Sequence, residues 1–106
     1  MKKVIGYLLL VISGCLVASC YSSHFVIDES DLSKAQAKYP GITQNDLIAG
    51  RKLYIANCST CHNLHQPTEF TEAKWLELVP DMAKEAKLSD AEAKLIEQFV
   101  ITKATL

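Results

Sequence analysis

Apolar residues recur with helical spacing in three segments between residue 42 and the end of the chain. The first segment covers residues 45–57, and Thr43 is its predicted N-cap. The residues expected on its inward face are spaced i, i+3 and i+7: Leu47, Gly50 and Tyr54. A glycine inside a helix costs about 1 kcal/mol relative to alanine. Gly50 is therefore either a tolerated interruption or the mark of a close crossing between two helices.

The second helical segment starts near Thr71 and carries an apolar stripe at i, i+3, i+4 and i+7: Trp75, Leu78, Val79 and Met82. Pro80 interrupts this stripe. Proline lacks the backbone N–H and disfavours the helical conformation at the residue before it. We therefore expect a break or kink at residues 79–80, followed by a short helical turn that carries Met82.

The third segment has the strongest helix signals. Ser89-Asp-Ala-Glu92 is a capping box. The apolar stripe around and after it comprises Leu88, Ala91, Leu95, Ile96 and Phe99. Since no part of the chain alternates convincingly with period two, the sequence predicts an all-α domain of three to four short helices.

The beginning of the chain has the layout of a secretory signal peptide, predicted over residues 1–19. Lys2 and Lys3 precede an apolar run that is too short to span a bilayer comfortably. Val17-Ala18-Ser19-Cys20 resembles a bacterial lipobox, which makes Cys20 the predicted lipidated first residue of the mature protein. Cys15 also fits the pattern, but the sequence turns polar directly after Cys20. Two acyl chains on this residue would give a stable membrane anchor.

Residues 20–41 are predicted to be a tether, rich in Ser, Asp and Lys, in which a short helix over residues 31–38 has weak support. The compact domain is expected over residues 42–106. Removal of residues 1–19 leaves nine basic and twelve acidic residues, and therefore a net charge of −3. Because nucleic-acid binding requires a basic face, the composition argues against it.

The motif with the most chemical content is Cys58-Ser-Thr-Cys-His62. Of the four cysteines, Cys15 and Cys20 belong to the export signal, so Cys58 and Cys61 remain as a pair. Zinc would have to be bound by Cys58, Cys61, His62 and His65. These residues lie within one eight-residue stretch, whereas structural zinc sites usually take two separated ligand pairs. Disulfide exchange is the other alternative, but Cys-x-x-Cys redox motifs normally follow a strand, and none is predicted.

Covalent haem fits the motif better than zinc or a redox disulfide. Cys58 and Cys61 are spaced to form thioethers with two vinyl groups of one porphyrin, and His62 then lies next to the iron as an axial ligand. Such attachment is made outside the cytoplasm, in agreement with the export signal. The candidates for the opposite axial position are Met82, His65 and His24. Met82 is favoured, because the Trp75 stripe directs it inward. His65 follows His62 too closely to reach around the haem and is expected to be a surface loop residue.

With these residues in view, the chain from about Ile42 to its end resembles a small class I-type cytochrome c. Gly50 and Tyr54 match the glycine and aromatic residue of that family's first helix, and Phe99 matches the aromatic residue of its last helix. The resemblance implies a cytochrome c-like helical bundle around one covalent haem c, with His62 and Met82 as the axial ligands of the iron.

The resemblance also implies a function. The protein would be an electron carrier and not an enzyme, with redox proteins as partners and no small-molecule substrate. The lipid on Cys20 would hold it at the periplasmic side of a bacterial membrane. The alternative is a haem sensor or small peroxidase whose sixth coordination site is open.

Overall fold

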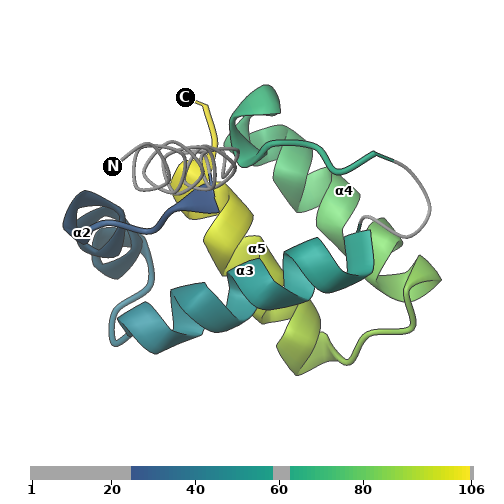
Figure 1. Cartoon of the computed structure of the whole chain (residues 1–106), viewed down its shortest axis with the longest axis horizontal. Helices are drawn as coiled ribbons and strands as arrows, with labels where there is room; N and C mark the ends of the chain where they lie inside the picture. Colours follow the sequence, from purple (N-terminus) through teal and green to yellow (C-terminus); the bar gives the residue numbers. More distant parts are fainter. Residues whose placement is uncertain (1–24, 59–62, 106) are drawn as a thin grey trace, which may run out of the picture.

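The computed structural model of the chain describes residues 25–58 and 63–105. The helices of this part of the chain are α2 (Glu29–Lys38), α3 (Gln44–Cys58), the 3-10 turn η2 (Pro67–Glu69), α4 (Glu72–Glu85) and α5 (Asp90–Lys103) (Figure 1). The β structure in the same residues is an isolated bridge between Thr71 and Thr105. The prediction of an all-α protein is confirmed.

Helices α3 and α5 cross at the centre of the molecule and make the most extensive helix–helix contact (Figure 1). Gly50 is the reason that they can approach so closely. A Cβ atom at this position would lie 2.1 Å from the carbonyl oxygen of Leu95 and 3.0 Å from Cβ of Phe99. Gly50 therefore marks a close helix crossing, the second of the two interpretations that the sequence left open.

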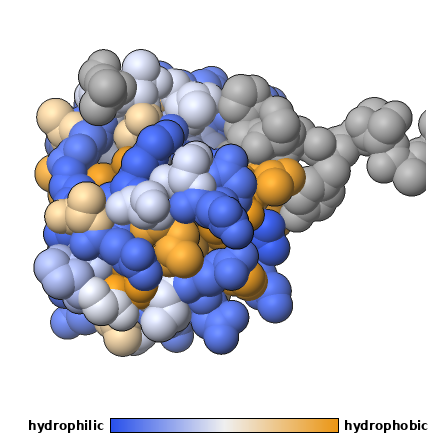
Figure 2. Space-filling model, turned by 90° about the vertical axis from the view of Figure 1, so that its left-hand side faces the viewer, coloured by the Kyte–Doolittle hydropathy of each residue, from blue (hydrophilic) through white to orange (hydrophobic). Residues whose placement is uncertain are grey.

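The main core lies between α3, α4 and α5. Its largest fully buried side chains are Tyr54, Trp75 and Phe99, packed with Val79 and Val100. The face predicted for α3 is confirmed, since Leu47, Gly50 and Tyr54 are all buried. In the stripe predicted for α4, Trp75 and Val79 are buried, and the other two residues, Leu78 and Met82, are half-buried. On the side of the molecule around α2, hydrophilic side chains predominate at the surface and apolar ones show between them (Figure 2).

Side-chain caps begin α3, α4 and α5, the helices that form the main core. Thr43 Oγ1 accepts a hydrogen bond from Asp46 N at 3.2 Å, and the Asp46 carboxylate accepts one from Thr43 N at 2.8 Å. Ser89 Oγ accepts from Glu92 N at 3.2 Å. The two predicted N-caps are confirmed, and Thr71 caps α4 in the same way.

The predicted break at residues 79–80 is wrong, because α4 continues through Pro80 from Glu72 to Glu85. A proline inside a helix removes the hydrogen bond to the carbonyl four residues earlier, which here belongs to Leu76. Leu76 is 46% exposed, and Pro80 is exposed as well, so water can reach this carbonyl. Burial of Trp75 and Val79 on the opposite side holds the helix against the core.

The segment before residue 42 differs from the predicted tether. Helix α2 begins with a capping box formed by Asp28 and Asp31, and it packs against α5. Asp31 is only 4% exposed, and its Oδ2 lies 2.6 Å from Nζ of Lys103. Ala35 forms a second small core with Ile42 and Leu47. Residues 25–41 are therefore part of the folded body, whereas the predicted signal peptide and Cys20 lie outside the described residues.

Candidate functional site

Cys58 is the last residue of α3, so the close helix crossing leads directly into the Cys-x-x-Cys-His motif. Its side chain is half-buried and packs against the main core. The remainder of the motif, including Cys61 and His62, lies outside the described residues. The structure thus places the first thiol of the predicted site at the end of a helix.

The loop that follows the motif is attached to the core through its backbone carbonyls. Tyr54 donates its hydroxyl to the carbonyl of His65, and buried Trp75 Nε1 donates to the carbonyl of Pro67 at 2.8 Å. At the other end of the loop, Thr105 N donates to the carbonyl of Phe70 at 3.2 Å. The chain is consequently held on both sides of the motif, by α3 before it and by these three donors after it.

Aromatic side chains pack this loop onto the helices. Trp75 contacts Tyr54 and Phe70 edge-on, with ring centroids 5.8 Å and 5.1 Å apart. Burial raises the pKa of the Tyr54 phenol well above its ordinary value, so the hydroxyl stays protonated and can donate to the loop. Sequence reasoning placed Tyr54 and Trp75 in the core and missed their role as loop anchors. The signal was present, because a buried indole N–H normally requires an acceptor.

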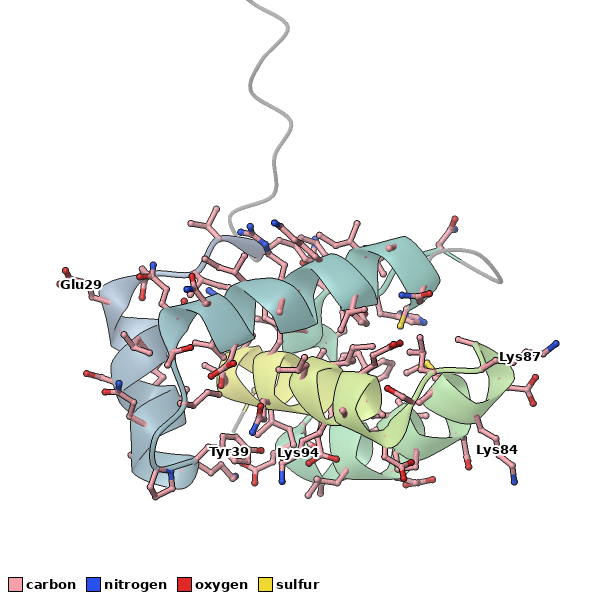
Figure 3. The ribbon with its side chains drawn as sticks, turned by 90° about the horizontal axis from the view of Figure 1, so that it is seen from below. Glu29, Tyr39, Lys84, Lys87 and Lys94 are labelled. Atoms are coloured by element: carbon pink, nitrogen blue, oxygen red, sulfur yellow. The ribbon has the colours of Figure 1, made fainter. Side chains whose placement is uncertain are left out.

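Met82, the predicted second axial ligand, is half-buried and packs against the same core as Cys58. Figure 3 shows the C-terminal ends of α3 and α4 at the same end of the molecule, where Lys84 and Lys87 are labelled. The two predicted site residues that the structure describes therefore share one apolar core. His62, the predicted ligand of the same iron, lies outside the described residues.

Further half-buried apolar side chains border this core: Leu53, Leu64, Leu78 and Leu88. Partly exposed leucines of this kind are the surface that a large apolar cofactor would cover and remove from water. A thiol at the end of a helix, a thioether on the same core and an apolar border fit the chemistry of a covalent haem.

The environment of the Cys58 thiol bears on the disulfide-exchange alternative. Burial raises the pKa of this thiol to about 11, above its ordinary value. The reactive form in disulfide exchange is the thiolate, and redox-active cysteines have a lowered pKa. At neutral pH this thiol remains protonated, which does not favour exchange.

His65, a weaker candidate for iron or zinc, lies in the loop with its side chain 43% exposed. Its Nδ1 is 3.5 Å from Oε2 of Glu69, and its ring meets Phe70 edge-on with centroids 5.1 Å apart. The prediction of a surface loop histidine is confirmed. Over residues 25–58 and 63–105, no group of three or more His, Cys, Asp or Glu side chains is arranged to hold a metal ion.

Comparison with known proteins gave no relatives: no family model, no curated protein and no solved structure matches this chain. Within the part of the chain that the structure describes, no helix combines the length and the apolar character needed to cross a membrane.

Proposed function

We propose that the protein is a single-haem c-type cytochrome that carries electrons between redox proteins. A lipid on Cys20 would hold it at the periplasmic side of a bacterial membrane. The observation that carries this proposal is the motif Cys58-Ser-Thr-Cys-His62, whose first residue ends a helix in which Gly50 makes a close crossing with the last helix. The cytochrome c-like arrangement of the bundle is part of the proposal.

Different residues of the site would hold the porphyrin and the iron of the haem. Cys58 and Cys61 would hold haem c through thioethers, and His62 and Met82 would bind its iron. When bound, the haem supplies a one-electron couple between ferric and ferrous iron. The soft sulfur of Met82 favours the ferrous state, and Tyr54 and Trp75 keep the loop beside the motif in one conformation.

The size of the domain supports a covalent cofactor. Folded chains of this length bury a smaller share of their surface than large domains do, and many depend on a disulfide, a metal or a cofactor. The exported domain has only Cys58 and Cys61 as a cysteine pair, so a cysteine-rich scaffold is not available to it. Haem covering the half-buried leucines around the core would supply the missing apolar contact.

The proposal is tested by producing the full chain together with a cytochrome c maturation system and staining a denaturing gel for haem. Because thioether-linked haem survives denaturation, the chain should give a haem-stained band. The matched control is the double variant Cys58→Ala/Cys61→Ala, which should give none and should lose most of its helical circular dichroism. An unstained native chain would refute the proposal.

A further inference from the structure

The described chain begins at a fixed point on the surface of α3. The ring of Phe25 stacks against Tyr54, with centroids 6.3 Å apart. Its carbonyl accepts a hydrogen bond from Arg51 Nη1 at 3.3 Å. Residue 25 is therefore attached to the middle of α3 at the edge of the main core, although it lies 26 positions before Arg51 in the sequence.

The proposed lipid anchor is close to this point. Only residues 21–24 separate Cys20 from Phe25. Fully extended, the chain from Cys20 to Phe25 would span at most about 18 Å. This is less than the length of α3, which is about 22 Å. A lipid on Cys20 would therefore keep the side of α3 that contacts Phe25 near the membrane surface.

That side of α3 has a composition suited to a lipid surface. Its inward face is formed by Leu47, Gly50 and Tyr54, and a second row at i, i+3, i+4 and i+7 runs along its outer flank: Ile48, Arg51, Lys52 and Ile55. We call this row the α3 stripe. Lys52 is exposed and the other three residues are half-buried, while Val26 on the attached segment is 46% exposed.

The charge of the α3 stripe is basic. Asp46, the acidic residue of α3, lies in the first turn of the helix. Its carboxylate accepts two hydrogen bonds of 2.8 Å, from the backbone N–H and from the hydroxyl of Thr43. Interleaved basic and apolar side chains are the pattern by which helices bind the interface of anionic bilayers.

We propose that the α3 stripe, together with Val26, is a docking face for the anionic phospholipid surface of the membrane to which the protein is anchored. This inference rests on the lipid anchor at Cys20 in the proposed function. Docking would fix the orientation of the domain. Lys84 and Lys94, which Figure 3 shows on the side opposite α3, would then point away from the bilayer.

The orientation can be measured with the lipidated full chain in vesicles of phosphatidylethanolamine and phosphatidylglycerol. The photo-crosslinking residue p-benzoylphenylalanine is placed at position 56 or at position 91. Both positions are exposed alanines in helices. Ala56 is one turn after Lys52, and Ala91 is one turn before Lys94. Irradiation should give lipid adducts predominantly from position 56, whereas equal yields from both positions would overturn the docking face.

A second pair of variants tests the charge. Because one basic residue near an anionic surface changes binding about fivefold, Lys52→Gln should lower the lipid adduct from position 56 by about that factor at low salt. Lys94→Gln should leave it unchanged. An equal response to both substitutions, or adducts with a second copy of the chain instead of lipid, would overturn the proposal.

The same samples distinguish failure of the lipid anchor from failure of the docking face. The mass of the N-terminal peptide reports lipidation of Cys20 directly. A chain without lipid would refute the anchor and the docking face with it, whereas a lipidated chain with equal adducts from positions 56 and 91 would refute the docking face alone.

Discussion

The buried ion pair between Asp31 and Lys103 makes the strongest prediction about stability, because it decides whether α2 belongs to the domain. The two side chains are 5% and 12% exposed, and Nζ and Oδ2 are 2.6 Å apart. We consider Asp31→Asn, which keeps the size of the side chain and an oxygen that can still accept from Asp28 N. The change leaves the ammonium of Lys103 buried without its counter-charge.

Breaking a buried pair by removing one charge typically costs about 3 kcal/mol or more of unfolding free energy, because the remaining charge has lost both water and partner. For a domain of this size, that corresponds to a decrease in melting temperature of about 12–24 °C. The double variant Asp31→Asn/Lys103→Met should recover much of the loss, since a buried pair can often be replaced by apolar side chains at little cost.

The assay is urea and thermal unfolding followed by circular dichroism on the full chain and its variants. The control is Glu77→Gln, which removes the exposed pair in which Lys74 Nζ lies 3.2 Å from Oε1 of Glu77. That change should cost less than about 1 kcal/mol. If Asp31→Asn is as mild as this control, α2 is not docked on α5, and residues 25–41 behave as the tether that the sequence predicted.

Three further predictions concern the helix crossing, the loop and the iron. Gly50→Ala should destabilise the fold by about 1–3 kcal/mol in urea unfolding, because its Cβ would overlap the Leu95 carbonyl; an unchanged midpoint would contradict the close crossing. Trp75→Phe keeps most of the ring but removes the donor to the Pro67 carbonyl, and it should lower the unfolding free energy by about 1–3 kcal/mol. Amide exchange over residues 63–70 should increase, and unaltered exchange would show that the loop does not depend on this bond. Met82→Ala should leave the haem stain intact but make the reduced protein bind carbon monoxide; identical carbon monoxide responses of wild type and variant would exclude Met82 as a ligand.

The helical pattern of the second half of the chain was predictable because it is local. Leu47, Gly50 and Tyr54 share a face by spacing alone, and the caps at Thr43 and Ser89 are formed by neighbouring residues. The interpretation of Pro80 failed because a local preference was outweighed by packing. Its ring lies on the exposed side of α4, so the helix loses one solvent-accessible hydrogen bond and keeps its buried face.

The short helix that the sequence supported weakly over residues 31–38 is present as α2, but its docking could not be derived in the same way, because its partners are distant in the sequence. Its residues are mostly polar, and it docks through Asp31 on Lys103 and through Ala35 on Leu47. The same limit applies to the site. The sequence predicts Cys58 and Met82 as site residues, and the structure places both on one core. The carbonyls that Tyr54 and Trp75 bind are set by a loop whose path no local pattern specifies.

The central claim is that one haem is bonded to the chain through both thiols of the motif. Trypsin should release residues 53–74 as a single peptide, because it cleaves after Lys52 and after Lys74 and no lysine or arginine lies between them. From material made with a cytochrome c maturation system, mass spectrometry should find this peptide heavier by one haem, with fragmentation assigning the bonds to Cys58 and Cys61. The same peptide at its unmodified mass, or with the two cysteines joined only to each other, would contradict the account.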